Sequence, residues 1–389
     1  MTTFFHVGDV HIGRERLGGL LPSQDFADAF AQVVDRALAE RADFVLVAGD
    51  FFDRARIEPN HLSEGERDLL RLQAAGIPVV AIEGNHDLVS SWDDRPSWLA
   101  YLNARGLVRL LRTEFAGSEP VMREWTEAGR RGNWLDLAGC RIYGAGWFGA
   151  STARRLAALA PRLEKRGFTI LLLHAGIHGQ APEFGMIDAA ELAVVRDRVD
   201  YVALGHMHKR YVVDGYAHNP GALESWTLDE AGYGDAKGCW RVQTLAQGFC
   251  AEHFAVARRP ILRLVTAWDR KAPLVDAVPK GLDPRTVVQL VVRARGLADC
   301  DRTQLAQELA AARGLTAIDL VWEPAAASAD PDAADPDLPR AAIEREEIEK
   351  LVAATGRYDD RIGTIVRLVE RIAAAPDSEA AWLALTQEA

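Results

Sequence analysis

Five apolar stretches of this chain each end in residue types that bind metal ions or transfer protons. The clearest ending is Gly84-Asn85-His86-Asp87, which follows the run from Pro78 to Ile82 and presents an amide oxygen, an imidazole and a carboxylate. The other four endings carry Asp9 with His11, Asp50, His174, and His206 with His208. Ligand sites in α/β sheets lie at the carboxyl ends of strands, so we expect all five endings to converge on one pocket.

A two-metal site is the chemistry that these side chains predict. The seven candidate ligands are Asp9, His11, Asp50, Asn85, His174, His206 and His208. Carboxylates, a carboxamide and imidazoles without thiolates suit Mn²⁺, Mg²⁺, Fe or Zn²⁺. Seven ligands are too many for one ion and suit two, and a carboxylate can bridge a pair of ions ~3.5–4 Å apart. Asp50 is the best bridging candidate, because it sits in a tight Gly-Asp turn after an apolar strand.

His86 is the candidate proton donor beside that site. It is adjacent to the candidate ligand Asn85 but faces a different way in an extended loop. We therefore predict that His86 protonates the leaving oxygen and that Asp87 orients it. The two ions would activate a bridging water and bind the phosphoryl oxygens, and acid–base help of this kind contributes roughly 10²–10⁴-fold. The same loops carry candidate phosphate or DNA contacts at Arg14, Arg54, Lys209 and Arg210.

The first 90 residues predict a β-α-β-α-β unit. Strands are expected at 3–7, 43–48 and 77–82, with helices at 25–40 and 63–75 between them. The first helix has apolar residues at helical spacing, and the second opens with Ser63 and Glu66 in a capping-box pattern. Alternating strands and helices of this kind indicate an α/β fold.

Residues 95–257 predict a second group of elements. A short helix is expected near 96–105, strands at 141–145, 168–173 and 200–204, and helices at 152–165 and 189–195. From 211 to 254 the pattern changes to short strands with turn signals such as Asn219-Pro220-Gly221. This change implies a second, more antiparallel sheet.

The rest of the chain predicts a small unit, a linker and a tail. Arg258-Arg259-Pro260 marks a boundary after the first domain, residues 1–257. Residues 258–323 form the small unit, with strands at 262–267, 287–294 and 317–322 and a helix at 302–313. Residues 324–340 are rich in Pro, Ala and Asp and indicate a linker, and residues 341–389 indicate a helical tail that includes a helical hairpin.

Composition is typical of a globular protein. The chain has 389 residues, 49% of them hydrophobic, which suggests two or three domains. No run approaches the ~18 apolar residues of a membrane helix. No signal peptide is visible and the four cysteines lack CxxC spacing, so we expect a cytoplasmic protein without a disulfide framework.

The charge balance is acidic, and the acidity is concentrated in the tail. The net charge is -11, of which residues 325–389 carry -7 and residues 1–324 carry -4. An acidic balance disfavours tight unaided binding to duplex DNA, although local positive loops can still hold phosphates.

The order of the motifs resembles the calcineurin-like metallophosphoesterase superfamily. Asp-x-His, Gly-Asp, Gly-Asn-His-Asp, His and Gly-His-x-His follow one another between residues 9 and 208. More specifically, the chain is similar to the SbcD nuclease family of double-strand-break repair, the meiotic-recombination-eleven type. This likeness rests on residues 6–13, 48–54 with Pro59, 82–87, 204–208 and 218–224, and it weakens beyond 324.

The resemblance implies a division of the ligands between two metals, usually Mn²⁺. One ion would bind Asp9, His11, Asp50 and His208, and the other would bind Asp50, Asn85, His174 and His206. His86 matches the catalytic histidine of the family. Asp53 lies near a position implicated in exonuclease action, where the family often has histidine.

The resemblance also implies a fold, an activity and partners. The fold would be a four-layer α/β/β/α sandwich with a small α+β capping domain. The activity would be that of a DNA exonuclease, 3′–5′ in direction, and a single-strand endonuclease acting on ends, hairpins and single strands. The partners would be a second copy of the chain and an SbcC-type ABC ATPase with a coiled coil, for which 341–389 is a candidate binding segment. The dimer would use helices near 63–75 and 96–105, with Trp98, Leu99 and Leu102 as candidate interface residues.

Two alternative interpretations remain open. The first is a protein phosphatase or small-nucleotide phosphodiesterase, since Gly-Asp-Phe-Phe-Asp-Arg echoes the phosphoprotein phosphatases. Those phosphatases follow Gly-Asn-His with Glu, where this chain has Asp87. The second is a binding scaffold with a dead site, which predicts the loss of a ligand. All seven ligands and His86 are present.

Overall fold

The computed structural model describes residues 1–19, 21–88, 96–179, 186–268, 271–294 and 302–324. Residues Met1–Pro324 form one compact unit, and the structure describes no residue beyond Pro324. The predicted linker (324–340), apart from its first residue, and the predicted helical tail (341–389) therefore lie outside the described residues.

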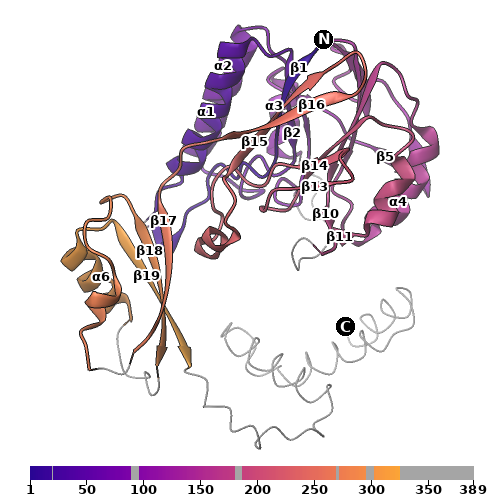
Figure 1. Cartoon of the computed structure of the whole chain (residues 1–389). Coiled ribbons are helices and arrows are strands. Elements are labelled where there is room, and N and C mark those ends of the chain that lie inside the picture. The colour runs from indigo at the N-terminus through magenta and orange to yellow at the C-terminus, as the bar shows by residue number, and fades with distance from the viewer. Residues whose placement is uncertain (20, 89–95, 180–185, 269–270, 295–301, 325–389) are drawn as a thin grey trace, which may run out of the picture. The chain divides into compact units, whose positions relative to one another are not determined.

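The first sheet carries the predicted β-α-β-α-β unit (Figure 1). Its strands, in spatial order, are β16 (Phe249–Ala255), β15 (Gly238–Thr244), β1 (Thr3–Val7), β2 (Phe44–Ala48), β3 (Val79–Ile82) and β4 (Arg109–Leu110). Strands β1 to β3 confirm the predicted strands of this unit, and β1 to β4 pair in parallel. Strand β15 pairs antiparallel with β1, and β16 pairs antiparallel with β15. The prediction that 211–254 belongs to a second sheet is therefore wrong for β15 and β16, which extend the first sheet.

Three helices pack against this sheet: α1 (Gln24–Glu40), α2 (Pro59–Ala74) and α3 (Trp98–Ala104). Helix α1 buries Phe26, Phe30 and Val33 of its predicted apolar stripe. Helix α2 begins at Pro59, four residues before the predicted start, because the fixed φ of proline suits the first helical position. Ser63 therefore lies inside α2, and the capping-box prediction is wrong.

Of the three dimer-interface residues predicted on α3, two are too buried to contact a second chain. Leu99 and Leu102 are 1% and 0% exposed and pack in the core between α3 and the first sheet. Fully buried side chains cannot contact another chain, so the interface prediction is wrong for these two leucines. Trp98 is partly buried at the border of the same core.

The second sheet is also mixed. Its strands, in spatial order, are β13 (Tyr211–Val213), β14 (Ala217–Asn219), β12 (Tyr201–Gly205), β9 (Phe168–His174), β8 (Cys140–Gly146) and β7 (Trp134–Leu137). The four central strands are parallel, and β13 and β7 pair antiparallel at the two edges. Helices α4 (Thr152–Leu159) and α5 (Ala189–Leu192) contribute to the core on its outer face.

The two sheets pack face to face through buried side chains. Phe4 and Leu46 of the first sheet meet Ile170, Leu172 and Tyr201 of the second, and all five are 0% exposed. With α1 to α3 on one side and α4 and α5 on the other, this gives the predicted four-layer α/β/β/α sandwich. The packing fixes the ends of β1, β2, β3, β9 and β12 relative to one another.

The small unit has the predicted elements at nearly the predicted bounds: β17 (Ile261–Ala267), β18 (Val287–Ala294), α6 (Arg302–Arg313) and β19 (Ala317–Pro324). Its strands are all parallel, with α6 between β18 and β19, so its local topology is β-α-β rather than α+β. Arg259, just before β17, donates two hydrogen bonds of 2.8 and 2.9 Å to Asp25 of α1. This ion pair ties the small unit to the sandwich.

Short elements complete the described chain. The remaining strands are β5 (Glu114–Ala116), β6 (Glu119–Val121), β10 (Gly176–Ile177) and β11 (Met186–Ile187). Short 3₁₀ helices lie at Leu17–Gly19, Gly149–Ser151, Ala160–Arg162, Ala193–Val195, Leu228–Tyr233 and Leu274–Ala277. Within the described ranges, we find no helix with the length and apolar content needed to cross a lipid bilayer.

Candidate metal centre

The five predicted loop tips meet where strands of both sheets end. Asp9 follows β1, Asp50 follows β2, Asn85 follows β3, His174 ends β9 and His206 follows β12. Three groups of potential ligand atoms occur among the described residues, and the atoms within each group lie within 4.8 Å of one another. The first comes from Asp9, His11 and His208, the second from Asp9, Asp50 and His174, and the third from His11, Asp53 and His86. Residues up to 199 positions apart in sequence therefore share one site.

In the first group, two imidazole nitrogens face each other. Nε2 of His11 lies 3.1 Å from Nε2 of His208 and 3.9 Å from Oδ2 of Asp50. Nδ1 of His208 is already engaged, 2.8 Å from the carboxylate of Glu230. Two neutral imidazoles arranged in this way direct their lone pairs at each other, so a proton or a cation must lie between them.

The second group also collects acceptor atoms at short range. Nε2 of His174 lies 3.3 Å from Oδ2 of Asp50 and 3.1 Å from Oδ1 of Asn85. The same Asn85 oxygen lies 3.0 Å from Nδ1 of His206. Asp50 faces both groups, which is where a bridging carboxylate must be. The donor set of both groups fits two divalent cations.

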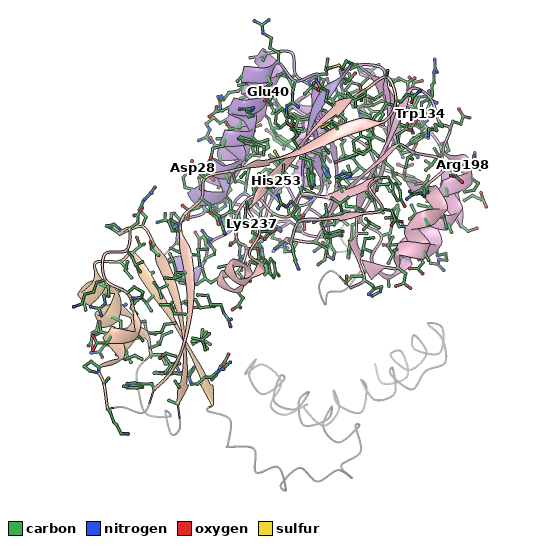
Figure 2. The ribbon with its side chains drawn as sticks, viewed as in Figure 1. Asp28, Glu40, Trp134, Arg198, Lys237 and His253 are labelled. Atoms are coloured by element: carbon green, nitrogen blue, oxygen red, sulfur yellow. The ribbon has the colours of Figure 1, made fainter. Side chains whose placement is uncertain are left out.

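The outward-facing nitrogens of two candidate ligands are fixed by buried partners. Nδ1 of His174 lies 2.7 Å from the carbonyl oxygen of Ala48, which can only accept, so Nε2 is left to face the site. Behind His208, Glu230 also accepts a 2.7 Å hydrogen bond from Lys237, a side chain labelled in Figure 2. Partners of this kind orient ligating histidines and raise their basicity.

Replacing Glu230 with glutamine tests this support. The amide loses the negative charge that faces His208 and Lys237, so we expect Mn²⁺ affinity to fall about 10–100-fold. Isothermal titration with Mn²⁺ measures the change. Asp229→Asn, at the neighbouring exposed position, is the matched control and should bind as the wild type does. Equal Mn²⁺ affinities in the three proteins would contradict the conclusion that Glu230 supports His208 as a metal ligand.

Burial and neighbouring charges shift the pKa values of the metal-free site in opposite directions. Burial lowers the pKa of His174, but the adjacent Asp50 carboxylate outweighs it and raises that pKa to about 9. Burial alone would raise the pKa of Asp50, yet His174 holds it below its usual range. Burial lowers the pKa of His11. A bound cation would replace the proton that these groups share.

The backbone is strained at four of the seven candidate ligands. Asp9, His11, Asp50 and His206 have φ values of 53°, 51°, 52° and 90°. Non-glycine residues in this region cost on the order of 1 kcal/mol or more, and such strain is concentrated at functional sites. The turns that present these side chains are therefore held by the surrounding sheets.

Gly84 is required by the close approach of two loops. A Cβ at this position would lie 2.1 Å from Oδ1 and 2.6 Å from the backbone nitrogen of Asp50. Gly84→Ala is therefore expected to displace Asp50 and to lower both metal occupancy and hydrolysis. The measurements are metal content by mass spectrometry and turnover of a chromogenic phosphodiester.

Gly232→Ala is the control for that substitution, since a Cβ there meets nothing within 4 Å. It should leave both measurements unchanged. A fully metallated, fully active Gly84→Ala protein would show that the loop tolerates the displacement.

His86 lies at the site, but its orienting partner differs from the prediction. Nδ1 of His86 is 2.7 Å from the main-chain oxygen of Asp53, and its ring packs edge-on against His11 at 4.8 Å. Asp87 instead accepts backbone hydrogen bonds from Phe51, Phe52 and Gly84. The prediction that Asp87 orients His86 is therefore wrong, because its carboxylate joins the β2 and β3 loops.

The candidate phosphate contacts have different environments. Arg14 lies 3.7 Å above the ring of Trp226, and Nε of Arg54 is 3.3 Å from Asp53 while 69% of its side chain is exposed. Lys209 and Arg210 follow His208 and are half-buried, with Arg210 5.9 Å from the Trp240 ring. Arg54 has the greatest freedom to reach a substrate.

Sequence reasoning missed three residues of the site. Trp226 donates a 2.7 Å hydrogen bond to Asp53, and Trp147 lies 4.6 Å from His206, ring to ring. The third is Glu230, behind His208. Trp147 and Trp226 lie on irregular loops outside the quoted motifs, so neither spacing nor hydrophobic period singled them out. Glu230 lies in the 3₁₀ helix Leu228–Tyr233, where its capping-box position after Thr227 was the one local signal.

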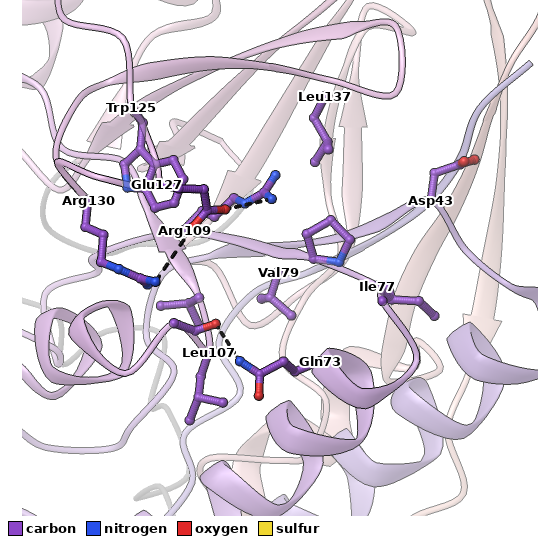
Figure 3. A pocket seen from close by; sticks show the side chains of 14 residues that line it. Asp43, Gln73, Ile77, Val79, Leu107, Arg109, Trp125, Glu127, Arg130 and Leu137 are labelled. Carbon is purple, nitrogen blue, oxygen red and sulfur yellow. Dashed lines mark hydrogen bonds and ion pairs between the residues drawn. The ribbon is translucent and has the colours of Figure 1, made fainter.

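A separate cavity of about 390 Å³ lies at the opposite ends of the first-sheet strands (Figure 3). Its lining includes Asp43 and Pro78, which directly precede β2 and β3. Glu127 in its wall is paired with Arg109 at 3.0 Å and with Arg130 at 3.7 Å. No candidate ligand lines this cavity, so it is not the site of the predicted chemistry.

The chain belongs to the calcineurin-like phosphoesterase family. The family model matches residues 2–210, which is more than half of the chain and includes all seven candidate ligands. The superfamily expected from the motif order is therefore confirmed. Members of this class are metal-dependent phosphoesterases, and the site described above contains candidate ligands for divalent metals.

Named relatives agree with the narrower resemblance. A protein of Archaeoglobus fulgidus named DNA double-strand break repair protein Mre11 is 32% identical over 237 residues, which is 59% of this chain and 51% of that protein. One of Aeropyrum pernix with the same name is 26% identical over 296 residues, 72% of this chain and 68% of its own. A Bacillus subtilis protein named uncharacterized metallophosphoesterase YhaO is 29% identical over 229 residues, which is 57% of this chain and 52% of that protein. The chain spans about half the length of the first of these relatives.

Proposed function

We propose that this chain is a two-metal phosphodiesterase that cuts DNA in double-strand-break repair. The observation that carries the proposal is the convergence of the candidate ligands around Asp50, with His86 at their edge. The proposed ligand sets are Asp9, His11, Asp50 and His208 for one ion and Asp50, Asn85, His174 and His206 for the other. The relatives that carry the Mre11 name support DNA as the substrate.

The residues of the chain have separable functions in the proposed hydrolysis. Two divalent ions held by these residues would supply Lewis-acid polarisation of the phosphoryl oxygens and a nucleophilic water at neutral pH. As the water oxygen bonds to phosphorus, the bond from phosphorus to the leaving 3′ oxygen breaks, and His86 donates a proton to that oxygen. Arg54 would hold a neighbouring phosphate, and the exposure of its side chain beside Asp53 supports this contact.

Finer properties follow from the resemblance and are part of the proposal. We propose 3′–5′ exonuclease and single-strand endonuclease activity, Mn²⁺ as the preferred metal, and a cytoplasmic location. We also propose a homodimer and an ABC-type ATPase partner bound through residues 341–389. Deletion of 341–389 would test the last point, since unchanged affinity for the ATPase would exclude this segment as the binding site.

A comparison of three substrates tests the proposed reaction. With Mn²⁺, the wild-type protein should hydrolyse an end-labelled oligonucleotide and bis(p-nitrophenyl) phosphate, and should turn over p-nitrophenyl phosphate much more slowly. A preference for the phosphomonoester would favour a phosphatase. Hydrolysis of the small diester alone, with DNA uncut in the presence and absence of the ATPase, would favour a small-molecule phosphodiesterase.

A further inference from the structure

A buried polar cluster lies against both His11 and His86. Asp53 is 2% exposed, and its Oδ1 accepts a 2.7 Å hydrogen bond from Nε1 of Trp226. The guanidinium of Arg14 stacks 3.7 Å above the Trp226 ring, and its Nη1 lies 3.8 Å from Oδ2 of Asp53. Asp53 is therefore held on both of its oxygens, which fixes the direction of its carboxylate.

Both histidines direct Nδ1 at residue 53. Nδ1 of His11 is 3.4 Å from the carboxylate Oδ1 of Asp53, an electrostatic contact rather than a hydrogen bond, since this buried nitrogen has no hydrogen-bond partner among the described residues. Nδ1 of His86 is 2.7 Å from the main-chain carbonyl oxygen of Asp53. Ionised carboxylates and carbonyls only accept hydrogen bonds. Each neutral imidazole therefore carries its proton on Nδ1 and its lone pair on Nε2.

This tautomer suits the proposed function of each histidine, metal binding for His11 and proton donation for His86. Nε2 of His11 faces Nε2 of His208 at 3.1 Å, so it is the atom available to a metal. A carboxylate on the far nitrogen of a ligating histidine fixes the ring and strengthens the ligand. In His86, a second proton can be added only at Nε2, and that is the proton available for a leaving oxygen.

We propose that Asp53 is a positioning residue with two separable functions. Its side chain fixes His11 as a metal ligand, and its main-chain carbonyl fixes His86 as a proton donor, with Trp226 holding the carboxylate in place. The inference rests on the proposed function, because it assigns support to that same site. Since one function uses the side chain and the other uses the backbone, substitution at position 53 should separate them.

Histidine tautomers in the metal-free full-length protein give the first test. Long-range ¹H–¹⁵N spectra of ¹⁵N-histidine-labelled protein distinguish a proton on Nδ1 from one on Nε2. In the wild type, both His11 and His86 should show the Nδ1–H form. Asp53→Ala should change His11 alone, and Asp53→Asn, which retains an oxygen acceptor, should restore it. An unchanged His11 in Asp53→Ala would overturn the proposal.

Mn²⁺ binding gives the second test. Asp53→Ala should lower the affinity for one of the two Mn²⁺ ions by about 10–100-fold, as the loss of a supporting partner behind a ligating histidine does. The affinity for the other ion should be unchanged. Saturating Mn²⁺ should then restore most of kcat, because His86 keeps its carbonyl partner. An equal loss of affinity for both ions, or a kcat that saturating Mn²⁺ does not restore, would overturn the separation of functions.

Trp226→Phe covers the case in which Asp53→Ala fails to fold. Phenylalanine keeps a ring beneath Arg14 but removes the N–H that holds Asp53. The affinity for the same ion should therefore fall, by a smaller factor than in Asp53→Ala. Wild-type affinity in this variant would overturn the part assigned to Trp226. The tautomer and Mn²⁺-affinity readouts need no DNA cleavage. A protein that binds two ions without cutting DNA would reject the proposed function and still decide the function of Asp53.

Discussion

Asp50→Ala is expected to lose both bound metals and phosphodiester hydrolysis together. The Asp50 carboxylate lies 3.3 Å from Nε2 of His174 and 3.9 Å from Nε2 of His11, so it serves both ligand groups. Its Oδ1 also accepts a 2.8 Å hydrogen bond from the backbone nitrogen of His86. Loss of metal stabilisation worth several kcal/mol corresponds to a fall of about 10³-fold or more in kcat. Metal content and turnover of bis(p-nitrophenyl) phosphate measure the two effects.

The matched control is Asp28→Ala. Asp28 lies on the exposed face of α1, where it bonds only locally, to Gln24 and Gln32 among the described contacts. Its removal should change neither metal content nor turnover. If Asp50→Ala kept two ions per chain and near-normal turnover, the bridging assignment would be wrong.

His86→Gln is expected to reduce DNA cleavage by about 10²–10⁴-fold while both metals stay bound, the range typical of a lost general acid. The ring of His86 is held through Nδ1 and contacts the edge of the ligand His11. His86 belongs to neither proposed ligand set, although it forms a close group with His11 and Asp53. Its backbone bond to Asp50 survives the substitution. The variant should therefore separate proton donation from metal binding.

Leaving-group dependence sharpens this prediction. p-Nitrophenolate leaves readily without a proton, whereas a 3′ alkoxide does not. His86→Gln should therefore lose much more activity on DNA than on bis(p-nitrophenyl) phosphate. His178→Gln, an exposed histidine outside both ligand groups, is the control. Equal losses on the two substrates would reject proton donation by His86.

The positions of the loop tips were predictable because each one follows from a short stretch of sequence, an apolar run that ends in a polar residue. A buried strand such as β2 is a short apolar run, and the turn after it must present its polar residue at the sheet edge. The structure brings the Asp50 carboxylate to within 3.3 Å of His174 and 3.9 Å of His11, as the convergence of strand ends predicts. The four-layer sandwich came from the family resemblance and needed the long-range packing of Leu46 against Ile170 to be seen directly.

The errors arose where a contact joins segments that are distant in sequence. Strand β15 pairs with β1 across more than 230 residues, and nothing in its own pattern names that partner. Asp87 was assigned to its sequence neighbour His86, whereas its carboxylate reaches back to the backbone of Phe51 and Phe52. Trp226 is fixed by Asp53 and Arg14, and no short motif records that arrangement.

The most direct measurement is Mn²⁺-dependent release of nucleotides from an end-labelled DNA duplex, with wild type and Asp50→Ala side by side. The two-metal nuclease account predicts cleavage by the wild type, no cleavage after chelation of the metal, and none by Asp50→Ala. Undiminished cleavage by Asp50→Ala, or cleavage that persists in the chelator, would contradict it.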